Sequence, residues 1–242
     1  MESQQLTTVN NFTFSAVNVD SLSGSKKTLV SLLVDTSGSV SSFKDSLETA
    51  ANIVIQATKK SATAEDIMIR TATFSNSAIR EVHGFVPVPF IDDAKYTGQF
   101  AAGGNTPLID ASIEAAESIE TYGKSLVDQD YTVNGIFFVI TDGEEYGSRI
   151  KNIGKVKEAL ARIRKDEAVE SIVAILVGVN DVDCKAALDK FHSEAGFDHF
   201  ISIGDATPSK LAKLGALISQ SVSSQSQSIG SGGPSQACNF TL

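Results

Sequence analysis

The sequence has few of the features that mark secreted or membrane proteins. It contains 2 cysteines and no tryptophan in 242 residues. Two cysteines offer one pair at most, which is no disulfide framework, so we expect a reducing compartment. The longest apolar runs, such as Ile172–Val179, are far shorter than the roughly 20 residues that a membrane-spanning helix needs.

Basic residues are also scarce. Lys and Arg total 20 against 29 Asp and Glu, which gives a formal net charge of -9. The chain therefore lacks the basic stripe of nucleic-acid-binding proteins, and anionic membranes should repel it. The negative charge is compatible with binding cations or basic partners. The alternative interpretation is that it only keeps the protein soluble. The opening residues, MESQQLTTVNNF, carry neither the basic nor the apolar part of a secretion signal, so we expect a cytoplasmic protein.

Apolar residues are plentiful, and their spacing predicts alternating strands and helices. They make up 42% of the chain, enough for a packed core. The predicted strands are Phe12–Val17, Thr28–Val34, Ile67–Phe74, Ala78–Val86, Gly135–Thr141, Ser171–Val179 and His199–Ile203, and the predicted helices are Phe43–Lys59, Leu108–Tyr122, Ile153–Asp166, Val182–Glu194 and Thr207–Ser221.

This alternation predicts an α/β fold: an open, doubly wound, mostly parallel sheet with helices on both faces. Only Ser75, Asn76 and Ser77 separate two of the strands, and so short a connection permits only an antiparallel hairpin. Pro87 and Pro89 end the second of these strands and fit an edge position.

The sequence divides into three parts. Residues 1–26 form an N-terminal extension with a candidate edge strand, and residues 27–222 form the domain. Residues 223–242 are rich in Ser, Gln and Gly and cannot build a core, so we expect a flexible tail. Phe240 and Leu242 near its end leave a second interpretation open, in which the tail docks on a partner or back onto the domain.

Polar residues gather where the predicted parallel strands end. Asp35, Ser37 and Ser39 alternate directly after the first core strand, and Gly38 lets the chain turn there. One carboxylate and two hydroxyls are hard oxygen donors of the kind that suits Mg²⁺. Taken alone, the same pattern also describes a turn that caps a helix.

Two further segments follow the same rule. Asp142 ends the strand GIFFVIT, so its carboxylate should lie at the same sheet edge. Thr106 follows Gly103 and Gly104 and precedes Pro107. Thr106 could simply cap the next helix, with Pro107 at the first helical position and the glycines acting as a hinge. Two Asp residues at strand ends, a Ser-x-Ser and a Gly-Gly-x-Thr together favour a shared site.

This set resembles the metal-ion-dependent adhesion site (MIDAS) of von Willebrand factor A (VWA) domains, over about residues 27 to 220. The resemblance implies a three-layer, Rossmann-like α/β fold with one antiparallel edge strand, in agreement with the hairpin. It also implies one Mg²⁺ ion, or alternatively Mn²⁺ or Ca²⁺. Its ligands would be hydroxyls of Ser37, Ser39 and Thr106 and carboxylates of Asp35 and Asp142, some through water.

The resemblance implies a non-enzymatic protein-interaction module, in which a partner's carboxylate completes the metal shell. Gly104, Asn105, Glu144 and Glu145 are candidate partner contacts, although the two Glu could belong to a solvated loop. Without a secretion signal or disulfides, the chain looks closer to intracellular bacterial or phage members. These include TerY-like stress or defence proteins and VWA proteins that act beside MoxR-type AAA ATPases, so the partner would be such an ATPase or its client.

Other functions fit fewer residues. A metal that only stabilises the loops would make the protein a structural scaffold. A Mg²⁺-dependent phosphohydrolase needs a base, and His83, His192 and His199 are predicted away from the functional edge. Phosphate binding by the Gly-Gly segment lacks the lysine of a P-loop, and an aspartyl phosphotransferase would need a second Asp soon after Asp35.

Overall fold

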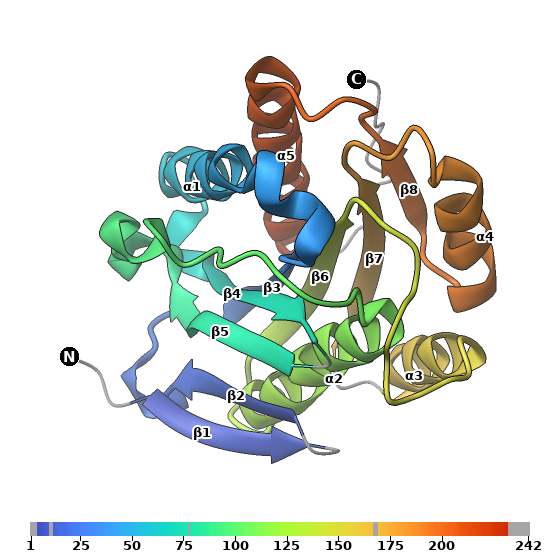
Figure 1. Ribbon diagram of the computed structural model, residues 1–242. Coiled ribbons are helices and arrows are strands. Elements are labelled where there is room, and N and C mark those ends of the chain that lie inside the picture. Colours follow the sequence, from blue (N-terminus) through green and yellow to red (C-terminus); the bar gives the residue numbers. More distant parts are fainter. Residues whose placement is uncertain (1–3, 10–11, 77, 167–168, 232–242) are drawn as a thin grey trace.

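A computed structural model describes residues 4–9, 12–76, 78–166 and 169–231. In these ranges one eight-stranded sheet runs through the molecule in the order β1-β2-β5-β4-β3-β6-β7-β8 (Figure 1). The strands are β1 (Gln4–Val9), β2 (Phe12–Val17), β3 (Lys26–Asp35), β4 (Ile67–Ser75), β5 (Ala78–Pro87), β6 (Thr132–Thr141), β7 (Ser171–Gly178) and β8 (His199–Ser202).

Five strands, β4, β3, β6, β7 and β8, are parallel. The central strand β3 is buried from Lys27 to Asp35. This explains why its sequence is almost continuously apolar, since helices must cover both of its faces. The chain thus has the α/β, mostly parallel fold that the sequence predicts, and the carboxyl ends of the parallel strands share one edge.

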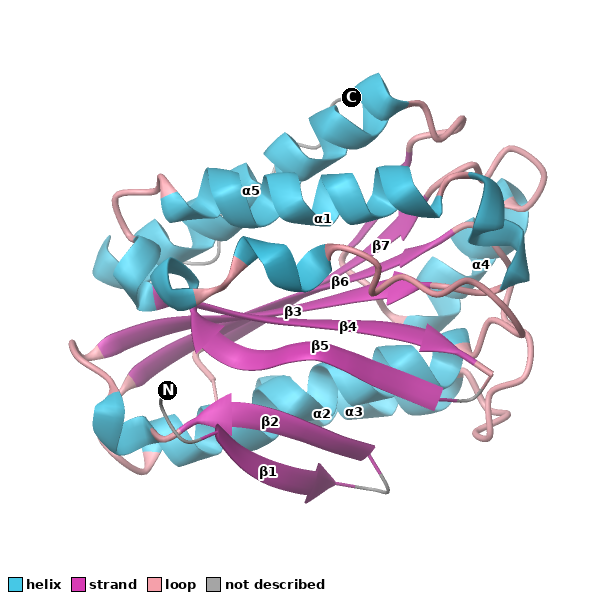
Figure 2. Ribbon diagram, turned by 60° about the vertical axis from the view of Figure 1, so that its left-hand side comes forward, coloured by secondary structure: helices cyan, strands magenta, loops and turns pink. Residues whose placement is uncertain are grey.

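Helices form the two outer layers (Figure 2). One face of the sheet packs against α1 (Lys44–Lys59) and α5 (Pro208–Ser231), and the other against α2 (Leu108–Val127), α3 (Gly154–Lys165) and α4 (Lys185–Ala195). Each layer has its own apolar core. Short 3-10 helices occupy the connections: η1 (Val19–Ser21), η2 (Gly38–Ser42), η3 (Ala64–Asp66), η4 (Val88–Phe90) and η5 (Asp93–Tyr96).

The hairpin of β4 and β5 is antiparallel, as its short connection predicts. However, β5 is not the edge of the sheet, because β2 lies beside it and β1 lies beyond β2. Gly84 makes this close approach feasible, since a Cβ there would lie 2.0 Å from the backbone oxygen of Ser15. The strand at Phe12–Val17 is therefore present but internal. The sequence does not reveal β1, whose polar residues QQLTTV lack a clear apolar period.

The last helix is longer than expected. The composition predicts a flexible tail from residue 223, but α5 continues to Ser231. Val222, Gln225 and Ser226 are buried in this stretch, so tertiary packing keeps a sequence of low apolar content helical. The rest of the tail, with Phe240 and Leu242, lies outside the described residues. Within the described ranges, no helix has both the length and the apolar character to cross a membrane.

Candidate metal centre

Three loops meet at the carboxyl edge of the sheet, and backbone hydrogen bonds fix them to one another. The amide of Gly103 donates to the carbonyl of Thr36 at 2.8 Å, and the amide of Gly38 donates to the carbonyl of Gly104 at 3.1 Å. Gly104 has φ +85°, a conformation that a residue with a Cβ rarely adopts. The glycine pair is therefore a rigid part of the rim, and it brings the Thr106 loop against the loop after β3.

Asp35 lies at the end of β3 with 1% of its surface exposed. Its Oδ1 accepts a hydrogen bond from the amide of Ser37 at 2.7 Å. Its Oδ2 accepts one from the hydroxyl of Thr141 at 2.6 Å. Both carboxylate oxygens are thus held in fixed positions.

The serines connect the first loop to the end of β6. The hydroxyl oxygens of Ser37 and Ser39 are 3.1 Å apart. The hydroxyl of Ser39 donates to Oδ1 of Asp142 at 2.8 Å. Together with the bond from the Ser37 amide to Asp35, these contacts join four of the five expected ligand residues in one hydrogen-bonded chain.

Thr106, the fifth expected ligand, lies at the same rim and is 7% exposed. The backbone of Thr106 pairs with that of Tyr146, whose amide donates to the Thr106 carbonyl at 2.8 Å. A Cβ built on Gly143 would lie 3.5 Å from the Thr106 hydroxyl oxygen. The hydroxyl therefore lies next to the turn that follows Asp142, and the structure brings all five residues to one place.

Burial makes the negative charge of this site costly. It raises the pKa of Asp35 to about 6, against the opposing effect of hydrogen bonds from Thr141 and Ser37. Burial also raises the pKa of Asp142. Among the described residues, neither carboxylate forms an ion pair with Lys or Arg. A bound cation would relieve this cost, since charges out of water need a partner.

The donor set also fits a hard divalent cation. Two carboxylates offset a charge of +2, and three hydroxyls add oxygen atoms without adding charge. In the described part of the chain, no cluster of three or more His, Cys, Asp or Glu side chains offers another metal site. Carboxylate and hydroxyl oxygens are hard donors, of the kind that Mg²⁺, Mn²⁺ and Ca²⁺ accept.

The candidate partner contacts divide into two groups. Gly104, Asn105 and Glu144 are exposed at the rim. Glu145 is turned inward, where its carboxylate accepts from the amide of Ile109 at 2.8 Å and from the amide and hydroxyl of Ser148 at 2.9 and 2.7 Å. The sequence pattern predicts that Glu145 faces a partner, but it caps α2 instead.

This cap also affects the helix N-termini near the rim. A helix N-terminus with free N–H groups attracts an incoming anion. The first turn of α2 is already satisfied by Glu145 and Ser148, and α1 begins only at Lys44, after η2. The N–H groups in the first turn of α2 are therefore not free to bind a partner's carboxylate.

Sequence reasoning missed three residues of this region. Thr141 holds Asp35, and the thiol of Cys184 donates to the backbone carbonyl of Asp142 at 3.1 Å. Tyr146 is 69% exposed beside Thr106. Only Thr141 left a signal, as the single hydroxyl in the apolar run GIFFVIT. Cys184 and Tyr146 reach the site through tertiary packing.

Comparison with known proteins identifies the fold. No family model and no curated protein matches the sequence. Among solved structures, the vWF domain of the type V pili tip protein Mfa5 from Porphyromonas gingivalis has a TM-score of 0.55 at 12% identity, over 90% of this chain and 99% of that chain. The SpRpn10 VWA domain has a TM-score of 0.50 at 14% identity, over 78% and 93%.

The pilus adhesin SpaC from Lactobacillus rhamnosus GG gives a TM-score of 0.56 at 11% identity and covers 92% of this chain. The chain spans only 34% of the length of SpaC. At such low identities the likeness concerns the fold alone. The fold class is thus the α/β, Rossmann-like fold of VWA domains, as the sequence pattern predicts.

Proposed function

We propose that this protein is a metal-dependent protein-interaction module that holds one Mg²⁺ ion at the carboxyl edge of its sheet. One observation carries the proposal: two buried carboxylates, Asp35 and Asp142, lie in one hydrogen-bonded chain with Ser37 and Ser39 and have no Lys or Arg partner among the described residues. Mn²⁺ or Ca²⁺ are the alternative ions.

The residues of the chain have distinct tasks in this site. Ser37, Ser39 and Thr106 would offer hydroxyl oxygens, while Asp35 and Asp142 supply negative charge and orient water. The ion would act as a Lewis acid that accepts a carboxylate from a partner. Thr141 fixes one oxygen of Asp35, and the backbone bonds of the glycine loop keep Thr106 in place.

The rim suits a protein surface. The exposed ring of Tyr146 is tied to Thr106 through the backbone, so its position depends on the same loop that bears a ligand. Tyrosine is enriched in protein interfaces because it is large and rigid. Exposed Glu144 would pair with a basic side chain of the partner, and Asn105 would offer hydrogen bonds.

The cellular setting is part of the same proposal. We place the protein in a bacterial or phage cytoplasm, as an adaptor or a stress- or defence-associated protein. Its partner would be a MoxR-type AAA ATPase or a client of one. The second candidate is a scaffold in which the metal only stabilises the three loops. We assign no enzymatic activity: His83 lies on β5, where its Nε2 is 2.6 Å from the Tyr96 hydroxyl, and not at the metal rim.

Calorimetry tests the metal site directly. Wild-type protein titrated with MgCl₂ or MnCl₂ should take up one ion, and Asp35→Asn and Asp142→Asn should each weaken uptake at least about tenfold. Asp183→Asn is a matched control, because Asp183 is exposed in the loop before α4. Absence of uptake by folded wild-type protein would exclude the proposal.

A second measurement separates the interaction module from the scaffold. A purified MoxR-type ATPase from the same source is the first partner to try, with binding measured in MgCl₂ and in EDTA. The interaction module predicts binding in Mg²⁺ only, and its loss in folded Asp142→Asn. The scaffold predicts that Mg²⁺ raises the melting temperature while binding does not depend on it.

A further inference from the structure

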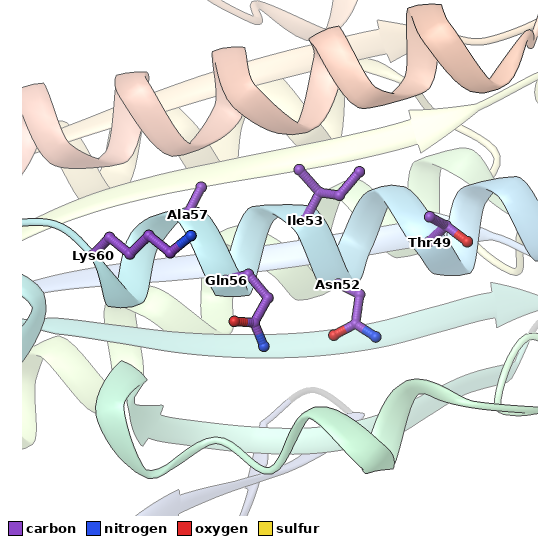
Figure 3. A pocket seen from close by; sticks show the side chains of 6 residues that line it. All are labelled: Thr49, Asn52, Ile53, Gln56, Ala57 and Lys60. Atoms are coloured by element: carbon purple, nitrogen blue, oxygen red, sulfur yellow. The ribbon is translucent and has the colours of Figure 1, made fainter.

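An open groove runs along the outer face of α1, on the side of the sheet away from α2. Its floor is lined by Thr49, Asn52, Ile53, Gln56, Ala57 and Lys60, at the three- and four-residue spacing of one helix face (Figure 3). Its volume is about 650 Å³. A second hollow of about 230 Å³ continues it between α1 and the start of α5, and shares Thr49 and Ile53 with it.

The groove combines apolar and polar features. Ile53 and Ala57 point towards α5, while Asn52 and Gln56 point to the other side of α1 (Figure 3). All four side chains are only half-buried. The side-chain oxygen of Asn52 is buried and accepts no hydrogen bond from the described residues. A buried acceptor without a donor is costly, so the groove favours a segment that offers backbone N–H groups and apolar side chains.

The sequence after α5 has these properties. Residues 232–242 read GGPSQACNFTL and carry no charged side chain. Cys238, Phe240 and Leu242 alternate with Asn239 and Thr241, so an extended backbone would place all three apolar side chains on one face. The Gly-Gly-Pro sequence before them is typical of a reversal of chain direction.

The distances allow this segment to return to α1. Thr58 of α1 lies beside Ser219 of α5, with their hydroxyl oxygens 3.3 Å apart. From Ser219 the helix runs on to Ser231, which is about 18 Å at the helical rise. The eleven residues that follow span about 36 Å when extended. If the chain turns back at Ser231, about 18 Å of the extended segment is used to return to the level of Thr58. The remaining length of about 18 Å is enough to run along α1 from Thr58 to Thr49.

We propose that residues 232–242 dock in an extended conformation in the groove along the outer face of α1, with Phe240 and Leu242 against Ile53 and Ala57. The segment would then cover part of the outer surface of α1. This surface lies away from the metal rim. A segment without charged side chains suits this groove, where Lys60, at one end, is the one ionic side chain among the described residues that line it.

Paramagnetic relaxation in the full chain tests this directly. Cys184→Ser leaves Cys238 as the one cysteine, because the sequence has 2, and a nitroxide can be attached there. Docking predicts broadened amide signals between Thr49 and Lys60. Unbroadened signals in these residues, or broadening confined to the metal loops, would overturn the proposal.

Two further measurements distinguish docking within one chain from binding between two copies. In a mixture of isotope-labelled protein without nitroxide and unlabelled protein with nitroxide, broadening of the same signals would show that the segment binds a second copy, and the intramolecular proposal would be wrong. Ala57→Glu in the nitroxide-labelled chain should remove the broadening. The matched control is Val127→Glu, at the end of α2 on the opposite face, which should leave it unchanged.

Thermal melting gives an independent check. Ending the chain after Ser231 should lower the melting temperature by roughly 5 °C, because the apolar contacts of Phe240 and Leu242 with α1 are lost. Ala57→Glu should lower it similarly in the full chain but have little effect in the shortened chain, because the contact is already lost. Equal effects of Ala57→Glu in both chains would contradict docking.

Discussion

The hydroxyl of Ser39 donates a 2.8 Å hydrogen bond to the carboxylate of Asp142, a residue 103 positions further along the chain. The two residues follow β3 and β6, which are direct neighbours in the sheet. Parallel pairing of these strands places their carboxyl ends side by side. The site therefore depends on the register of the sheet as well as on its residues.

The hydroxyl of Thr141 should be needed for metal affinity although it is not an expected ligand. Thr141→Val keeps the shape of the side chain but removes the 2.6 Å bond to Oδ2 of Asp35. Loss of such an outer partner lowers metal affinity by about 10- to 100-fold. Calorimetry with MgCl₂ measures this. Thr141→Ser retains the donor and should bind almost as wild type; unchanged affinity in folded Thr141→Val would show that the bond does not matter.

Metal-free stability should depend on pH through Asp35. Burial raises the pKa of Asp35 from 3.8 to about 6, so the folded protein favours the protonated form. The resulting stabilisation is complete below pH 3.8 and is lost as the pH rises through about 6. Relative to Asp35→Asn, wild-type protein in EDTA should lose about 2 kcal/mol of unfolding free energy between pH 4 and 7. Urea unfolding at both pH values checks this, and a constant difference would argue against it.

Metal binding should show the opposite trend with pH. A metal ion needs the ionised form of Asp35 and of Asp142, and burial raises the pKa of both. Mg²⁺ affinity should therefore increase as the pH rises through about 6, with release of protons on binding. Calorimetry in buffers of different ionisation enthalpy measures the number of protons released. No release near pH 6 would mean that Asp35 is already ionised in the metal-free protein.

A buried ion pair should dominate stability on the α2 side of the sheet. Arg70 of β4 is fully buried, and its guanidinium donates to both carboxylate oxygens of Glu114 in α2. Glu114→Ala leaves Glu81, which pairs with the Arg70 Nε at 2.8 Å, to compensate the buried cation, and should still cost about 3 kcal/mol in urea unfolding. Glu158→Ala breaks an exposed pair with Lys155 and should change stability by less than about 1 kcal/mol. Similar losses in the two variants would contradict this expectation.

Glu145 should contribute to stability rather than to partner binding. Glu145→Ala removes the acceptor for Ile109 in the first turn of α2 and for Ser148. The loss of such a cap costs about 1–2 kcal/mol. Glu144→Ala, at the exposed neighbouring position, should leave the melting temperature unchanged. If Glu144→Ala is the more destabilising change, the assignment of the two side chains is wrong.

The sequence patterns that predicted structure most reliably were those that only one arrangement of the chain can satisfy. The apolar run of β3 can be accommodated only between two layers of helices, and the short connection after Ser75 permits only a hairpin. Weak patterns left elements undetected. The strand β1 has no clear apolar period, and the last turns of α5 consist mainly of Ser and Gln. The strand β1 forms by pairing with β2, and the last turns of α5 are held by the packing of their buried side chains. A local sequence pattern does not contain either kind of contact.

The sequence by itself determined the α/β fold class and the five residues that converge at the rim, because strand ends in a parallel sheet share one edge. Only the tertiary structure decided how these residues are held. The hydroxyl of Thr141 donates to Asp35, and the amide of Gly38 donates to the carbonyl of Gly104. Glu145 accepts from the first turn of α2 and does not face outward. Such contacts join residues far apart in the chain, and a hydrogen bond depends on distances of a few tenths of an ångström that residue spacing does not specify.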